Sequence, residues 1–232
     1  VIIPPKGYFE KIQAVLKKYE VLMIADEVIC GFGRTGSMWG SQTYGIKPDI
    51  LTCAKALSSA YLPISAVMIS EEIFQGLRGN SEKLGLLGHG YTYSAHPACA
   101  AVALRTQELM EERNIIGHIQ AVSPHFQKRL ATLGEHELVG QARGVGLIGA
   151  VEIVADKATK RSYDPSAKIG ALIASTAQEH GLITRAMPGD IIGFCPPLII
   201  APDEIDEMFN RFTNALNETA RQIKQEGASA AQ

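Results

Sequence analysis

Two short apolar runs, VLMIA (21–25) and ILTCA (50–54), constrain the fold of this chain most strongly. Each is continuous and bounded by charged residues or proline, which is typical of a strand covered on both faces. ISAVMIS (64–70) has the same character. Helical periodicity precedes the first run, in YFEKIQAVLKKYE, and a short helix, EEIFQGLRG, is expected to end on Gly79. This alternation predicts an α/β fold with a mostly parallel sheet.

The character of the chain changes near residue 115. PACAAVALRTQELMEER and residues 115–133 predict two helices, the first with proline in its first turn. Beyond them we expect one strand in GVGLIGAVEIV, a serine-capped helix in SAKIGALIASTAQEHG, and short strands in LITRA and DIIGF. The sequence therefore predicts the carboxy-terminal part of a large α/β domain over 1–115 and a small α+β domain over 116–232.

The last predicted helix, DEIDEMFNRFTNALNETARQIK, has the clearest amphipathic pattern. Its first turn is acidic and its last turn is basic, as the helix dipole favours. GASAAQ is expected to be a frayed tail. One stripe of the helix carries Ile205, Met208, Phe209, Phe212, Leu216 and Ile223.

Composition argues against several classes of function. The 232 residues carry a formal net charge of −2 at pH 7, which disfavours nucleic acid as a partner. No apolar run approaches the ~18 residues that span a bilayer, so no membrane association is expected. The four scattered cysteines, Cys30, Cys53, Cys99 and Cys195, have no metal-ligand spacing. They are expected to be reduced thiols in a cytoplasmic protein without a metal site.

The segment LMIADEVICGFGRTG (22–36) allows three interpretations. Gly31 to Gly36 spell the G-x-G-x-x-G of a dinucleotide site, yet five residues separate them from the strand and no helical stripe follows. An apolar run that ends in Asp-Glu is also typical of an ATPase. The chain contains no Gly-Lys pair of a phosphate loop, which weakens that interpretation without excluding it. In the third interpretation, Asp26 holds the ring nitrogen of another cofactor.

Lys55 favours the third interpretation. It follows the run 50–54 and lies 29 positions after Asp26, which follows the run 21–25. Ligands bind beyond the carboxyl ends of parallel strands, so we expect the two side chains to converge at one edge of the sheet. In pyridoxal phosphate enzymes a lysine forms a Schiff base and a carboxylate keeps the pyridine nitrogen protonated. A solvent-facing lysine and an aspartate that caps a turn would fit these positions equally well.

Three longer motifs carry a family resemblance. ADEVICGFGRTGSMWG, KPDILTCAKALSSAYLPISAVMIS and GHGYTYSAHPACAAVA resemble the class III (omega) aminotransferases, a fold-type I pyridoxal phosphate family. The match is dense from Val1 to about Arg113 and continues more loosely through the small domain. The resemblance implies pyridoxal 5′-phosphate as cofactor. It also implies that residues 1–115 form part of the mostly parallel sheet of the large domain.

The family pattern implies roles for three residues of the cofactor site. Asp26 would be the partner of the pyridine nitrogen, and Val28 would pack against the face of the ring. Lys55 would be the Schiff-base lysine, which also moves the proton of the substrate.

A second group of residues is implicated at subunit contacts. Thr92 matches the threonine that binds the cofactor phosphate of the neighbouring subunit, with Tyr91 beside it, which implies a homodimer. Gly31 to Gly36 would be a structural loop near this contact. The resemblance implies no chemical role for Glu27 or Arg34, and a mutual ion pair is the simplest expectation for them.

The implied reaction is ping-pong transamination between an omega-amino acid or amine and a keto acid such as pyruvate. Arg185 occupies the place of the carboxylate-binding arginine in the branch that uses pyruvate. The arginine of the ornithine, acetylornithine and γ-aminobutyrate branch would stand at Gly193. A pairing of Arg185 with Asp190 at a hairpin end is the structural alternative. Racemase, decarboxylase or aminomutase activity, or an inactive fragment that only packs against a partner, are the functional alternatives.

The chain begins at Val1 with neither methionine nor the features of a signal peptide, and it reads as the carboxy-terminal half of such an enzyme. In the family, the amino-terminal half supplies a phosphate-binding loop at a helix start and an aromatic residue that stacks on the ring. We therefore expect the fragment alone to be inactive. The amino donor and the choice between dimer and tetramer do not follow from these residues.

Overall fold

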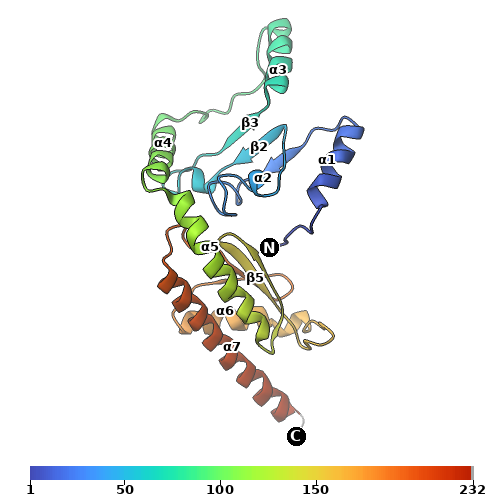
Figure 1. Ribbon diagram of the computed structural model, residues 1–232, viewed down its shortest axis with the longest axis vertical. Helices are drawn as coiled ribbons and strands as arrows, with labels where there is room; N and C mark the ends of the chain where they lie inside the picture. The colour runs from blue at the N-terminus through green and yellow to red at the C-terminus, as the bar shows by residue number, and fades with distance from the viewer. Residues whose placement is uncertain (231–232) are drawn as a thin grey trace. The chain divides into compact units, whose positions relative to one another are not determined.

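The structure is a computed structural model that describes residues 1–230, and the chain divides into two compact units. The first unit comprises residues 4–117, and the second comprises residues 118–232 together with Val1–Ile3. The expected division into 1–115 and 116–232 stays a prediction. Figure 1 shows the elements of each unit along the chain.

A three-stranded sheet of order β1-β2-β3 forms the centre of the first unit. Its strands are β1 (Ile24–Asp26), β2 (Ile50–Cys53) and β3 (Ala66–Ile69). β1 and β2 are parallel, as expected, whereas β3 runs antiparallel to β2. The connection before β3 contains turns and one short 3-10 helix, Lys55–Leu57, instead of a crossover helix, so the chain returns in the opposite direction.

Four helices belong to the first unit: α1 (Tyr8–Lys18), α2 (Gly40–Thr43), α3 (Glu71–Leu84) and α4 (Pro97–Glu112). The expectation that α3 ends on Gly79 is wrong. Its amino end is capped by Ser70, whose Oγ accepts the N–H of Ile73. Its carboxyl end lies at Gly85, which adopts the left-handed conformation that commonly ends helices.

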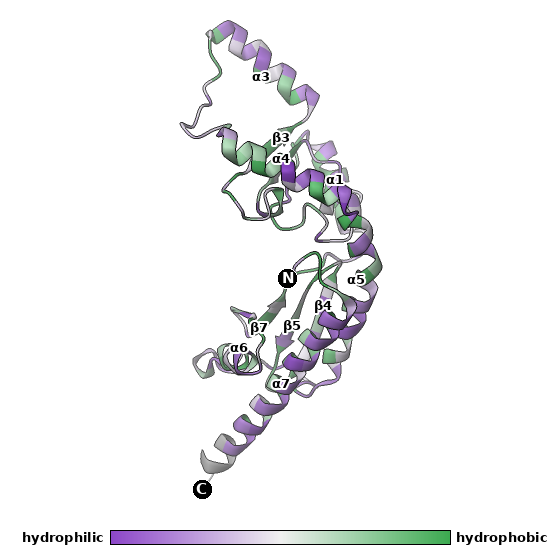
Figure 2. Cartoon of the chain, turned by 90° about the vertical axis from the view of Figure 1, so that its left-hand side faces the viewer, coloured by the Kyte–Doolittle hydropathy of each residue, from purple (hydrophilic) through white to green (hydrophobic). Residues whose placement is uncertain are grey.

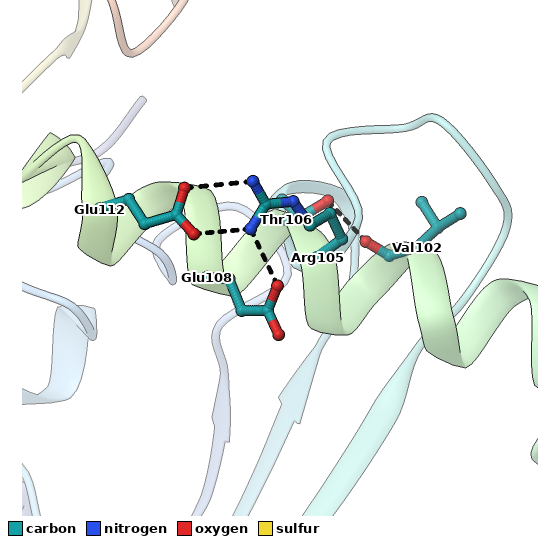
Figure 3. Close-up of polar contacts among 5 residues, drawn as sticks. All are labelled: Val102, Arg105, Thr106, Glu108 and Glu112. Atoms are coloured by element: carbon teal, nitrogen blue, oxygen red, sulfur yellow. Dashed lines mark hydrogen bonds and ion pairs between the residues drawn. The ribbon is translucent and has the colours of Figure 1, made fainter.

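An exposed ion-pair network lies along α4 (Figure 3). The Arg105 guanidinium donates to Glu112 at 2.7 and 3.1 Å and to Glu108 at 2.9 Å. These contacts raise the pKa of Arg105 and lower the pKa of Glu112. Because the pKa of Glu112 is lowered on folding, its contribution is present above its ordinary pKa and is lost as the pH falls. Such exposed pairs contribute little to overall stability.

The second unit is built on an antiparallel sheet of order β4-β5-β7-β6. One strand was expected over GVGLIGAVEIV, but the structure has a hairpin, because the chain turns at Gly146, which has a φ of 57°. Three helices accompany the sheet: α5 (Ile115–Thr132), α6 (Ile169–Glu179) and α7 (Pro202–Ala230). The strands are β4 (Val139–Val145), β5 (Ile148–Ile153), β6 (Arg185–Met187) and β7 (Ile191–Phe194).

Two further expectations about these helices need correction. The residue before α6 is Lys168, which has a left-handed backbone and makes no side-chain cap, so the expected serine cap is not formed. α7 continues into the segment GASAAQ as far as Ala230, where a frayed tail was expected, and residues 231–232 lie outside the described residues. Among residues 1–230, no helix combines the length and the apolar character needed to cross a membrane.

The two units differ in the size of their hydrophobic cores. In the second unit, Phe209 of α7 contacts Phe126 and Phe194 at centroid distances of 5.3 Å. Four residues of the stripe expected on α7, Ile205, Phe209, Phe212 and Leu216, are buried, whereas Met208 and Ile223 are partly exposed. In the first unit the buried hydrophobic cluster comprises Phe32, Leu51 and Cys53. Strands β3 and β7 are both hydrophobic (Figure 2). β7 contributes buried residues, whereas most residues of β3 are exposed. Exposed apolar side chains of the first unit include Val21, Leu22, Ile24, Val67, Met68 and Ile69.

This difference predicts separate folding behaviour for the two units. Residues 118–232, expressed alone, should melt cooperatively as a soluble protein, because their core is buried. Residues 4–117 should aggregate through their uncovered sheet and cause the 232-residue chain to aggregate as well. Circular dichroism melting and size-exclusion chromatography test both outcomes. A soluble, cooperatively melting segment 4–117 would contradict this account.

Candidate active site

The carboxyl ends of β1 and β2 form one edge of the first unit's sheet. Asp26 is the last residue of β1 and pairs in register with Thr52 of β2. β2 ends at Cys53, and Lys55 lies two residues further along the chain. Both ionisable residues are exposed. The parallel pairing therefore brings Asp26 and Lys55 to the same edge of the sheet.

Asp26 is oriented by the turn that follows it. Its Oδ1 accepts the N–H of Val28 at 3.0 Å, and Val28 itself is half-buried. Its other oxygen, Oδ2, accepts no hydrogen bond from any residue that the structure describes. An oxygen open in this way fits a ligand that donates an N–H, as a protonated pyridine ring does.

Lys55 begins a tight turn with an unusual backbone. Its φ is 47°, and Ser59 and Ala60 are also left-handed, with φ of 48° and 61°. Non-glycine residues in this region typically cost about 1–3 kcal/mol each and often mark functional sites. Two side-chain hydrogen bonds hold the turn: Ser58 Oγ donates to Leu62 O at 2.6 Å within the same segment, and Gln107 of α4 donates to Leu57 O at 2.9 Å. The Lys55 amine makes no hydrogen bond within residues 1–230, so an amine and an acceptor are both open at this edge.

The glycine-rich segment after β1 forms a closed loop without a long helix. The N–H of Phe32 donates to Met38 O at 2.6 Å, and the Phe32 ring packs on Trp39 at 4.8 Å. Gly33 and Gly36 adopt φ of 102° and 98°, which other residues rarely adopt. The short α2 follows the loop, so the dinucleotide interpretation is wrong for this segment.

Glu27 also lies at this edge, and the sequence analysis did not explain its position. Its side chain is buried, and both carboxylate oxygens accept backbone N–H groups at the start of α2. The sequence expectation was an ion pair with Arg34. The pattern that could have indicated the buried role is the Asp-Glu pair itself, since consecutive side chains at a strand end point to opposite faces.

Tyr91 and Thr92 lie in the exposed loop before α4. Tyr91 is 79% exposed, and its ring contacts His89 edge-on at 5.3 Å. In the described part of the chain, the Thr92 hydroxyl makes no hydrogen bond. Both residues expected to contact a second subunit are therefore exposed in this loop, and neither is hydrogen-bonded to Asp26 or Lys55 among the described residues.

Arg185 begins β6 in the second unit and stands opposite Gly193 of β7 in the strand register. The expected alternative, a pairing with Asp190, is not found, because Asp190 Oδ1 accepts the N–H of Gly170 at 2.8 Å. The Arg185 guanidinium is exposed and has no partner among the residues described. It is therefore available to bind an anion.

Comparisons with known proteins connect this geometry to a family. The model for class III aminotransferases matches residues 1–216. The uncharacterized aminotransferase y4uB of Sinorhizobium fredii is 46% identical over 97% of this chain and 48% of its own length. The mitochondrial gamma aminobutyrate transaminase 1 of Solanum lycopersicum is 44% identical over 97% of this chain and 44% of its own.

A solved structure gives the same result. The omega transaminase of Pseudomonas jessenii, in complex with PMP, superposes with a TM-score of 0.93 at 48% identity, covering 97% of this chain and 49% of that one. The chain spans about half the length of the curated relatives it matches. The fold-type I architecture expected from the sequence is confirmed, with one antiparallel strand in the part of the sheet present here. The chain belongs to the class III aminotransferase family, whose members use pyridoxal phosphate.

Proposed function

We propose that the protein transfers amino groups between an omega-amino acid or amine and a keto acid such as pyruvate, with pyridoxal phosphate as cofactor. The observation that carries the proposal is the parallel pairing of β1 and β2, with Asp26 and Lys55 at one edge. Family membership supports the reaction class, and the omega transaminase and gamma aminobutyrate transaminase relatives support an omega-amino donor.

The residues of this edge have distinct tasks in the proposed reaction. Pyridoxal phosphate, when bound, links covalently to amino groups and withdraws electrons from the adjacent carbon. The Asp26 carboxylate would hold the proton on the pyridine nitrogen and so favour that withdrawal. Lys55 Nζ would hold the cofactor covalently, and once the amino group of the donor had replaced it there, the freed amine would take the proton from the donor carbon that bears the amino group. Val28 would pack against the face of the ring. The acceptor uses the same groups in reverse, which gives ping-pong kinetics.

Replacing Lys55 tests this proposal. In the protein at its full encoded length, Lys55→Ala should lower transamination by about 10²–10⁴-fold, because no amine remains to move the proton. Lys47→Ala is the matched control, since Lys47 is another exposed lysine of the same unit. The assay follows alanine formation from pyruvate with β-alanine as donor. Equal activity in the two variants would refute the proposal, and Lys55-dependent turnover without a keto acid would indicate another class III activity.

We further propose that Thr92 acts across a subunit boundary. The exposed hydroxyl and the exposed aromatic rings beside it support a contact with a second copy of the chain. Thr92 would then bind the cofactor phosphate of the neighbouring subunit, and Tyr91 would lie beside that phosphate. A homodimer would be the smallest active form.

Mixed dimers test the contribution of Thr92. Thr92→Ala and Lys55→Ala proteins, each impaired alone, should recover activity after mixing and subunit exchange. At equal amounts we expect about a quarter of wild-type activity, because half of the dimers are mixed and each has one complete site. Inactive hybrids, with subunit exchange verified by tagged subunits, would show that Thr92 acts within its own subunit.

The strand register supports a role for Arg185 in binding substrate carboxylates. Side chains opposite each other in an antiparallel pair lie within about 4.5–5.5 Å at their Cβ atoms. Position 193, where the other branch carries arginine, is the glycine directly opposite Arg185. The side chains of arginines at positions 185 and 193 would therefore leave the sheet from neighbouring Cα atoms. In this chain position 193 is glycine, so of the two positions Arg185 is the one that supplies a guanidinium. Its two parallel N–H donors match a carboxylate.

Arg185→Ala should therefore discriminate between substrates. KM for pyruvate and β-alanine should rise about 10- to 100-fold, the expected loss for hydrogen bonds to a charged group. The half-reaction with 1-phenylethylamine, which has no carboxylate, should be spared. Arg221→Ala is the control, since Arg221 is also an exposed arginine of the second unit. Equal losses on both half-reactions would mean that Arg185 supports the fold and does not select substrates.

A further inference from the structure

We propose that Glu27 is a positioning residue that fixes the direction of the Asp26 carboxylate. This inference rests on the proposed function, since Asp26 matters through the cofactor that it would contact. Glu27 itself makes no contact with that edge through its side chain. It acts through the peptide that joins it to Val28.

The Glu27 carboxylate is enclosed by backbone. The residue is 3% exposed, its Oε1 accepts the N–H of Ser41 at 2.6 Å, and its Oε2 accepts the N–H of Gly40 at 2.8 Å. A buried carboxylate requires such partners, and hydrogen bonds to a charged acceptor are stronger than those between neutral groups. The side chain therefore ties the end of β1 to the start of α2.

The packing around Glu27 leaves no room for it to shift. A Cβ at Gly40 would lie 3.0 Å from Glu27 Oε2 and 2.8 Å from Cys30 Cβ. A Cβ at Gly31 would lie 2.8 Å from Glu27 O and 2.9 Å from the Trp39 ring. The glycines at both positions thus permit the backbone to close around the carboxylate.

The backbone of Glu27 is held on both sides. Its N–H donates to Thr52 O at 2.8 Å, which extends the pairing with β2 one residue beyond Asp26. Its carbonyl oxygen accepts the N–H of Gly31 at 2.9 Å. The same peptide bond carries the Val28 N–H that donates to Asp26 Oδ1. Because a peptide bond is planar, fixing the carbonyl oxygen fixes the direction of that N–H and hence of the Asp26 carboxylate.

Asp49 offers a matched control at the other end of the same strand pair. Its Oδ2 accepts the N–H of Met23 at 2.7 Å, so a carboxylate also joins the residues that directly precede β1 and β2. Asp49 lies at the amino end of β2, whereas the proposed cofactor edge lies at the carboxyl end. If Glu27 only stabilised the sheet, Glu27→Gln and Asp49→Asn would have similar effects.

The first test uses the cofactor-free protein at its full encoded length. Glu27→Gln keeps the shape but turns an amide N–H₂ toward a backbone donor, so the peptide should loosen. Hydrogen exchange of the Val28 amide should accelerate at least about tenfold in Glu27→Gln and stay unchanged in Asp49→Asn. Gly40→Ala, which displaces the carboxylate from the other side, should act like Glu27→Gln. Unchanged Val28 exchange in both variants would overturn the inference.

The second test measures pyridoxal phosphate binding by absorbance titration. Glu27→Gln should weaken the affinity by about tenfold or more, in the direction of Asp26→Asn, while Asp49→Asn stays near wild type. Equal losses in Glu27→Gln and Asp49→Asn would mean a purely structural role and would contradict the inference. Absence of binding in the wild type would instead refute the proposed function, and the exchange experiment would still decide the role of Glu27.

Discussion

The parallel pairing of β1 with β2 is the constraint on which the account of this chain depends. Two three- to four-residue strands, in register from Ile24↔Ile50 to Asp26↔Thr52, bring the ends of distant segments to one edge. The pairing continues one residue further through the hydrogen bond from Glu27 N to Thr52 O. Without this register, a carboxylate and a lysine 29 positions apart would have no reason to share a site.

The two acidic residues at the carboxyl end of β1, Asp26 in the strand and Glu27 just after it, differ in exposure and in role. Asp26 is exposed and keeps one oxygen open. Glu27 is buried, and both of its carboxylate oxygens accept backbone N–H groups. Alternation of side chains along a strand produces this division. The Asp26 carboxylate is thus accessible and oriented, and the neighbouring Glu27 carboxylate is buried and anchored. On the neighbouring strand, β2, the corresponding feature is the turn that follows it, where Lys55 has a left-handed backbone.

Sequence reasoning located what depends on local pattern. The strand ends at Asp26 and just before Lys55 followed from continuous apolar runs, and the buried positions of α7 followed from its helical period. It failed where conformation depends on a tertiary partner or on a single backbone angle. Gly146 splits one apparent strand into a hairpin, and α3 continues past Gly79 until the left-handed Gly85 ends it. The buried role of Glu27 was missed because its partners are backbone N–H groups thirteen and fourteen residues away.

The attachment point of the cofactor tests the central claim most directly. Borohydride reduction of the cofactor-loaded protein at its full encoded length, followed by digestion and mass spectrometry, locates the lysine that carries the cofactor. The account predicts a single modified peptide, modified at Lys55, because this lysine follows the end of β2 at the edge of the sheet where β1 ends in Asp26. Modification of Lys47 or of any other lysine would contradict the assignment of this edge as the catalytic site.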